Sequence, residues 1–170
     1  MLMLRKLTLK DEKKYMAYIK AWKDEDIVPH ALDANGLAYD LFIDQLNMRE
    51  QGLYEPKTNV PDELYVMVNQ QDDFIGVISL RAYLNEHLLA YDGHIGYGIH
   101  PKHRKKGYAK VMLKLALDIY KKRQILKVLV TCNEENIASK KVIESCHGVL
   151  ENKVYKTDGY ILRYWISLSD

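Results

Sequence analysis

A helix-forming segment stands between two β-prone segments in the middle of the chain. Apolar residues recur at helical spacing from Ala109 to Tyr120 and form one continuous face. The flanking segments over 94–99 and 126–132 are typical of strands, and the second is apolar enough to be buried on both sides. A strand–helix–strand unit predicts a parallel pair of strands joined by a right-handed crossover.

The remaining elements surround this unit with hairpins. Their order predicts one domain over residues 1–170, with a mixed α/β (α+β) fold, a central mixed sheet and helices on both faces. The predicted elements are a strand over 3–8, helices from Asp11 and over 38–49, a loop over 52–62, strands over 64–68 and 74–80, an ambiguous segment over 82–91, a helix capped by Asn133 and followed by Gly148, and strands over 149–155 and 160–168 around an Asp158-Gly159 turn.

Positive charge is concentrated in one part of the chain. Between Pro101 and Lys127 ten Lys or Arg accompany a single acid, so this segment carries +9 and the rest −7, although the total is only +2. A local basic block predicts a localised anionic partner rather than broad nucleic-acid binding. The chain shows no secretory signal and no apolar run near the ~20 residues that span a bilayer, so we expect a cytoplasmic protein without a membrane partner.

The basic block contains a turn suited to phosphate binding. Arg104-Lys105-Lys106-Gly107-Tyr108-Ala109 follows the predicted strand over 94–99 and opens the central helix. The first amides of a helix lack intrahelical partners and carry the positive end of its dipole, so they attract anions. Gly107 permits a positive φ or a close approach of backbone to ligand. The pattern matches neither a P-loop nor a dinucleotide-binding glycine turn.

This turn resembles the acetyl-CoA signature of the GNAT superfamily of N-acetyltransferases, which is written Gln/Arg-x-x-Gly-x-Gly/Ala. Ile99-His100-Pro101 precedes it, and a block over 136–144 resembles the Asn-bearing helix of the same superfamily. The resemblance covers residues 93–148 well and is compatible with the element order of the whole chain. It implies a sheet whose parallel strands splay apart, and an acyltransferase that uses acetyl-CoA as co-substrate.

The resemblance also assigns residues to acetyl-CoA. The strand before the turn would bind the pantetheine arm through its backbone, the turn would bind the pyrophosphate, and Asn136 would face the cofactor. No metal site is predicted, because the histidines and cysteines are scattered. The residues predicted to bind the cofactor are Tyr97, Gly98, Ile99, Arg104, Lys105, Lys106, Gly107, Tyr108, Ala109, Lys110, Asn136 and Ser139.

Acetyl transfer to an amine requires a neutral amine, a donor to the oxyanion and often a proton for the departing thiolate. The resemblance assigns the oxyanion donor to the backbone N–H of Ile99. No carboxylate occurs over 94–99 or 126–132, so the catalytic base stays open between His94 and Glu86. Histidine suits this task because its ordinary pKa is ~6.5.

The acid is open as well. The tyrosine that commonly serves the superfamily is replaced here by Ile143. Tyr97 or Tyr160 could take its place, or the thiolate could leave without help. A nucleophilic role for Cys132 is disfavoured, because a small buried thiol without a paired base is more typical of a core residue.

The sequence therefore predicts transfer of an acetyl group from acetyl-CoA to a primary amine by direct attack in a ternary complex. A non-catalytic acyl-CoA-binding or sensing module is the alternative, because the usual carboxylate and tyrosine are missing. We expect the acceptor to be a small-molecule amine or a protein N-terminus. The strand over 163–168 offers a surface for a second copy, so a homodimer is a further expectation.

Overall fold

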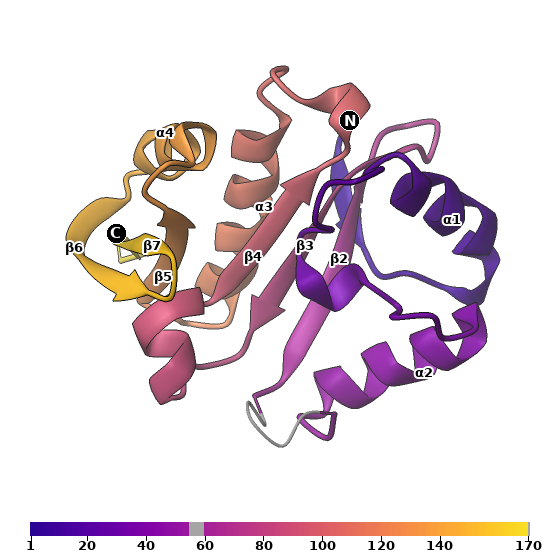
Figure 1. Cartoon of the computed structure of the whole chain (residues 1–170), viewed down its shortest axis with the longest axis horizontal. Coiled ribbons are helices and arrows are strands. Elements are labelled where there is room, and N and C mark those ends of the chain that lie inside the picture. The colour runs from indigo at the N-terminus through magenta and orange to yellow at the C-terminus, as the bar shows by residue number, and fades with distance from the viewer. Residues whose placement is uncertain (55–59, 170) are drawn as a thin grey trace.

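The computed structural model describes residues 1–54 and 60–169, which form a seven-stranded sheet in the order β1-β2-β3-β4-β5-β7-β6 (Figure 1). Strands β4 and β5 run parallel, and the other neighbours are antiparallel. The strands are β1 (Met3–Arg5), β2 (Asp62–Val68), β3 (Phe74–Arg81), β4 (Ile95–Ile99), β5 (Lys127–Asn133), β6 (Val149–Lys156) and β7 (Gly159–Ser167), and the α-helices are α1 (Glu12–Lys20), α2 (Tyr39–Glu50), α3 (Tyr108–Lys122) and α4 (Ile137–Ser145).

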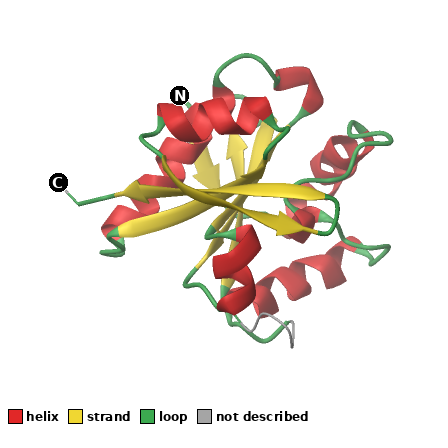
Figure 2. Ribbon diagram, turned by 60° about the vertical axis from the view of Figure 1, so that its left-hand side comes forward, coloured by secondary structure: helices red, strands yellow, loops and turns green. Residues whose placement is uncertain are grey.

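Helices cover both faces of the sheet, as predicted (Figure 2). α1 and α2 pack on one face, where Tyr18 and Phe42 share a core with Val66 of β2. α3 and α4 pack on the other face, where Met112 and Ile143 belong to a second core. The apolar stripe predicted for the central helix is the side of α3 that this second core buries.

The parallel strands β4 and β5 separate soon after they begin. Among the described residues their one register pair is Ile95 with Val130. Just before it, the His94 N–H donates to the Leu129 carbonyl at 2.8 Å. β4 then continues to Ile99 paired with β3 alone. This geometry confirms the splayed pair, and the gap that it leaves is where the candidate site lies.

Two turns were predicted at the wrong residues. The N-cap of α4 is Asn136 rather than Asn133, because β5 continues through Asn133 and a turn separates it from the helix. The C-terminal hairpin turns at Thr157 and Asp158, because Gly159 already belongs to β7. The ambiguous segment over 82–91 leads into a π-helical turn, η3 (Leu88–Asp92).

The loop predicted over 52–62 includes residues 55–59, which lie outside the described part of the chain. β2 begins at Asp62, the last residue of the predicted loop and two residues before the predicted strand. Within the described ranges, no helix combines the length and the apolar character needed to cross a membrane.

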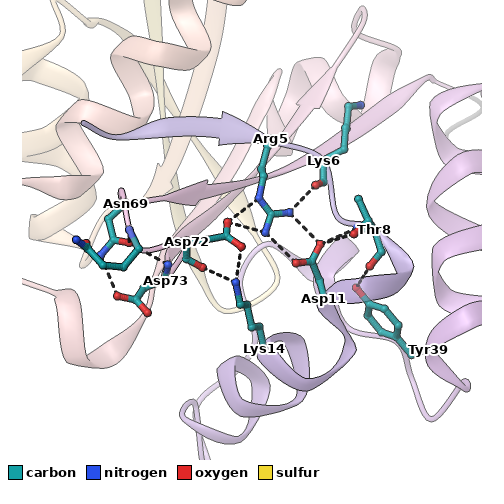
Figure 3. A network of polar contacts seen from close by, with 10 residues as sticks. Arg5, Lys6, Thr8, Asp11, Lys14, Tyr39, Asn69, Asp72 and Asp73 are labelled. Carbon is teal, nitrogen blue, oxygen red and sulfur yellow. Dashed lines mark hydrogen bonds and ion pairs between the residues drawn. The ribbon is translucent and has the colours of Figure 1, made fainter.

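A polar network turns the chain from β1 into α1 (Figure 3). The Arg5 guanidinium donates to both Asp11 carboxylate oxygens at 2.9 and 2.8 Å and to Asp72 at 2.9 Å, while Lys14 also bonds Asp72. Burial opposes the ionisation of Asp11, yet the bonds from Arg5 and Thr8 outweigh it and lower its pKa to about 2. The Thr8 N–H donates to Asp11 at 2.8 Å instead of to a strand partner, so β1 ends at Arg5 rather than continuing to Thr8.

Candidate active site

α3 begins at an open glycine turn. Gly107 is the N-cap with a φ of 79°, and no atom lies within 4 Å of the position that its side chain would take. Helical bonding starts only with the Val111 N–H, which donates to the Gly107 carbonyl, so the amides from Tyr108 to Lys110 lack partners within the helix. With the exposed Lys105 and Lys106 beside it, this helix start is suited to binding an anion.

The first cavity, of about 530 Å³, lies at this helix start. Eleven of the twelve residues predicted to bind the cofactor line it, and the exception is Lys106. The structure thus brings together backbone from β4, the turn before α3 and the first turn of α4. The other lining residues are Trp22, Glu25, Val28, His103, Ala138 and Val142.

Arg104 is held by the protein itself. Its Nη1 donates to Glu25 at 2.7 Å, its Nε donates to the Ile99 carbonyl at 3.2 Å, and its guanidinium lies 5.1 Å from the Trp22 ring centroid. Arg104 therefore ties the turn to the end of β4 and to the segment after α1. Lys105 and Lys110, which line the same cavity, bring exposed positive charge to it.

The amides of β4 alternate between its two edges. The His100 N–H donates to β3 at 3.0 Å, and on the same side the His94 carbonyl accepts from the Arg81 N–H at 2.9 Å. The even-numbered residues between them therefore face β3. Tyr97 and Ile99 direct their N–H groups to the other edge, into the gap beside β5.

Gly98 allows the segment after α1 to approach β4 closely. A Cβ atom at Gly98 would lie 2.2 Å from the Val28 carbonyl oxygen and 2.9 Å from the Trp22 ring. Both neighbours line the first cavity. Only a residue without a side chain fits here, so Gly98 shapes the wall of the cavity.

Tyr97 and Ser139 join β4 to α4 across the gap. The Tyr97 Oη lies 2.8 Å from the Ser139 Oγ, and the Ser139 N–H donates to the capping Oδ1 of Asn136 at 3.0 Å. Burial raises the pKa of Tyr97 to about 12, while the bond to Ser139 offsets part of the rise. The Tyr97 hydroxyl is therefore protonated at neutral pH and can serve as a hydrogen-bond donor.

A second cavity, of about 490 Å³, meets the first at these residues. The two cavities share Val28, Tyr97, Asn136 and Ser139 as lining residues. The second cavity also receives residues from the ends of β3 and β5, the start of β2 and η3. Its charged and titratable lining residues are His30, Arg49, Asp62, Arg81, His87, Asp92, Cys132 and Lys156.

Two adjoining cavities at a splayed strand pair provide room for two ligands side by side. The sequence profile described as the acetyltransferase (GNAT) domain matches residues 1–149 of the chain. The chain belongs to the GNAT acetyltransferase family. No curated protein sequence matches this GNAT chain significantly.

Solved structures share the fold of this GNAT chain at low sequence identity. A ribosomal-protein-S5-alanine acetyltransferase from Vibrio fischeri superposes with a TM-score of 0.73 at 15% identity, covering 99% of this chain and 94% of that one. RimL, a ribosomal L7/L12 α-N-protein acetyltransferase solved with coenzyme A, gives 0.71 at 17% identity, with 98% and 93% covered. A spermidine N-acetyltransferase from Vibrio cholerae, solved with CoA and spermine, gives 0.65 at 18% identity, with 98% and 95% covered.

The charged lining of the second cavity was missed by sequence reasoning about this GNAT chain. Arg49 lies in the last turn of α2, Asp62 opens β2, Arg81 ends β3, Asp92 ends η3 and Lys156 ends β6. A charged residue at the end of a β-rich run, as at Arg81, is the one local signal. It does not indicate which ends meet, because that depends on the strand order.

His94 lies at the closed end of the parallel pair. Its Nδ1 accepts the Leu129 N–H at 2.9 Å, and its ring packs against the rings of Tyr120 and Trp165. Burial lowers the pKa of His94 to about 4, and the charge of Arg81 adds to this effect. His94 is not among the described residues that line either cavity, so the structure does not place it beside the hydroxyls of Tyr97 and Ser139.

Glu86 is exposed just before η3, and it too is absent from the described lining of both cavities. As catalytic bases, His94 and Glu86 therefore stay predictions. Cys132 and Cys146 are free and buried. Over the described ranges, no three His, Cys, Asp or Glu side chains are grouped so that they could hold a metal ion.

Proposed function

We propose that this GNAT protein transfers an acetyl group from acetyl-CoA, bound in the first cavity, to a primary amine bound in the second. One observation carries the proposal: the cavities meet at Tyr97 and Ser139, in the gap between β4 and β5. A thioester in the first cavity and an amine in the second would face each other there.

The first cavity fits the chemistry of acetyl-CoA. The unpartnered amides at the start of α3 would bind the pyrophosphate, and the open space at Gly107 allows it to approach the backbone. The Tyr97 N–H in the gap would bond the pantetheine arm, which leaves the Ile99 N–H for the reacting carbonyl oxygen. Coenzyme A in the RimL and spermidine acetyltransferase structures, which share this fold, supports the proposal.

The residues at the junction suit each change in charge during transfer. The amine nitrogen bonds to the thioester carbonyl carbon, and the Ile99 N–H would donate to the oxygen on which negative charge develops. As the C–S bond breaks, the Tyr97 hydroxyl would give its proton to the thiolate. Ser139, 2.8 Å from Tyr97, would stabilise the tyrosinate until solvent returns the proton.

The amine must be neutral when it attacks, and its nitrogen must give up a further proton as the tetrahedral intermediate collapses to the amide. His94 and Glu86 are the bases proposed from sequence, and the second cavity adds the carboxylates of Asp62 and Asp92. Burial opposes the ionisation of Asp92, but a hydrogen bond and charge from Lys156 outweigh it and lower its pKa. Asp92 is therefore a weak base and better suited to orienting neighbouring groups.

The proposal leaves the acceptor as an amine of unspecified structure. The structural neighbours are named for a ribosomal protein in one case and for spermidine in another, so the shared fold accommodates both protein and small-molecule amines. We extend this range to the present chain only as a proposal.

A turnover assay tests the proposed function. The protein is incubated with acetyl-CoA and a mixed panel of amino acids, polyamines and short peptides, and released CoA thiol and acetylated products are followed by absorbance and mass spectrometry. We expect one class of amine to gain an acetyl group with stoichiometric thiol release. Acetyl-CoA binding without transfer to any amine would contradict the proposal and favour the sensing module.

A further inference from the structure

The second cavity is lined by more cationic than anionic side chains. Arg49, Arg81 and Lys156 contribute positive charge, whereas Asp62 and Asp92 contribute negative charge. A cavity with this balance favours a ligand that carries negative charge.

Both carboxylates of the cavity already have partners. Asp62 accepts a hydrogen bond from Ser79 and lies 3.7 Å from the Arg49 guanidinium. Asp92 lies 3.1 Å from the Lys156 ammonium and 2.9 Å from the His87 ring. These pairs account for two of the three cations and for both acids.

Among the described residues, Arg81 has no carboxylate bonded to its side chain, although its charge still acts on Asp92 and helps to lower the pKa of that residue. The Arg81 Nη1 donates to the backbone carbonyls of Asp92 at 3.1 Å and Gly93 at 3.0 Å, and within the described ranges it makes no ion pair. A guanidinium fixed through one edge by backbone carbonyls is positioned to bind a carboxylate through the other.

The position of Arg81 relates it directly to the junction of the cavities. A Cβ atom at Gly96 would lie 3.8 Å from the Arg81 Nη2 and 3.4 Å from Pro29, so this nitrogen lies beside β4. The next residue on β4 is Tyr97, whose side chain leaves the strand on the opposite face but lines the same cavity as Arg81, with its hydroxyl at Ser139. A ligand that bonds Arg81 would therefore present its other end to the place where transfer is proposed.

We propose that the acceptor is a primary amine that also carries a carboxylate, and that Arg81 binds this carboxylate. The inference rests on the proposed function and names the substrate class of the same site. A free amino acid and a peptide with an acidic N-terminal residue share this chemistry. A volume of about 490 Å³ has room for either an amino acid or the first residues of a peptide.

A neighbouring third cavity points to a different ligand, and the comparison favours the carboxylate. The third cavity is lined by Glu134, Glu135 and Asp158, which would attract a polyamine. It adjoins the second cavity, with which it shares six described lining residues, but it shares none with the first cavity, whereas the second cavity shares four. The amine that reaches the thioester is therefore the one in the second cavity.

Matched pairs of acceptors test this inference. One arm compares amino acids with their amides, and a second compares peptide amides that begin with Asp or Glu with those that begin with Asn or Gln. Spermidine is the third arm. We expect a carboxylate in one of the first two arms to raise kcat/KM by about tenfold or more, since a charge-assisted bond contributes at least that much.

Variants assign the preference to Arg81. Arg81→Met should bring the acid-to-amide ratio close to one by raising KM for the acid, and Arg81→Lys should restore it in part. Lys153→Met is the control, because it also removes one positive charge. Lys153 pairs with Glu134 and is itself absent from the lining of the three cavities, so the acid-to-amide ratio should not change. Thermal unfolding and acetyl-CoA titration of each variant show that it is folded and binds the co-substrate.

Three outcomes would overturn the inference. Equal or faster turnover of the amides or of spermidine by the wild type would do so and leave the proposed function intact. An unchanged acid-to-amide ratio in folded Arg81→Met would remove Arg81 from the account. Absence of turnover with every amine, although acetyl-CoA binds, would overturn both proposals together.

Discussion

The Tyr97 Oη and the Ser139 Oγ lie 2.8 Å apart where the two cavities meet. One side chain comes from β4 and the other from the first turn of α4, so their contact bridges the splayed sheet. Because the pKa of Tyr97 is raised to about 12 by burial, the pair keeps its protons over the pH range in which an enzyme works.

Replacement of Tyr97 by Phe should lower kcat by roughly 10²-fold, because the thiolate loses its proton donor. KM for acetyl-CoA should change little, since the Tyr97 N–H that faces the gap belongs to the backbone. Steady-state release of CoA thiol measures both constants. Ser139→Ala should lower kcat less, because the tyrosine remains.

The control for this pair is Tyr155→Phe. Tyr155 is 62% exposed on β6 and donates its hydroxyl hydrogen to the Thr157 carbonyl. Its loss should leave both constants unchanged. Wild-type kcat in Tyr97→Phe would instead indicate that the thiolate leaves without assistance.

Gly98→Ala should destabilise the fold by about 1–3 kcal/mol, because the new Cβ would meet the Val28 carbonyl at 2.2 Å. Acetyl-CoA binding should weaken as well, since Val28 and Trp22 must move and both line the first cavity. Urea unfolding and calorimetric titration measure the two effects.

Gly159→Ala provides the comparison. No atom lies within 4 Å of a Cβ at Gly159, so the change should alter the free energy of unfolding by less than about 0.5 kcal/mol. Equal stabilities for the two alanine variants would contradict the close approach of the segment after α1 to β4.

His94 should make the protein less stable as the pH falls. Its pKa is about 4 when folded and ~6.5 when unfolded, so between these values the unfolded state binds the additional proton. The neutral His94 therefore costs no stability above pH 6.5. The free energy of unfolding then falls by about 3 kcal/mol in total as the pH is lowered from 6.5 to 4. Urea unfolding across this range measures it.

His94→Asn is the informative variant, because the Asn Oδ1 can still accept the Leu129 N–H that the imidazole Nδ1 accepts at 2.9 Å. Its stability should depend less on pH between 6.5 and 4, although packing against Tyr120 is lost. A profile as steep as that of the wild type would contradict the pKa assigned here. Loss of turnover by the folded variant at pH 7 would support His94 as the base.

The fold was predictable to the extent that local patterns determine it. The stripe from Ala109 to Tyr120 indicated α3, and the β-prone segments on either side indicated the parallel pair that it joins. The errors arose where two local interactions compete for the same stretch of backbone. Asn133 and Asn136 can both cap a helix, and the choice depends on how far β5 extends against β7. β1 ends before Thr8 because the Thr8 N–H donates to the Asp11 side chain, which no periodicity reveals.

The site was predictable only where it is contiguous in sequence. The turn from Arg104 to Lys110 and the adjoining β4 line the first cavity because a single loop and two elements build it. The second cavity is built from segments far apart in the chain, so Arg81 and Asp92 become neighbours only after the strand order is known. Neither residue carries a motif of its own.

The central claim is that acetyl-CoA binds at the start of α3, and a calorimetric titration with two substitutions at Gly107 tests it most directly. Gly107 has a φ of 79°, and no atom lies within 4 Å of the position of a Cβ there. Gly107→Ala therefore adds backbone strain but no charge. Gly107→Glu adds a carboxylate where the pyrophosphate would bind. We predict one molecule of acetyl-CoA per chain for the wild type, a modest loss of affinity for the alanine variant, and a loss of at least about 10²-fold for the folded glutamate variant. Equal affinity of the alanine and glutamate variants would contradict the account.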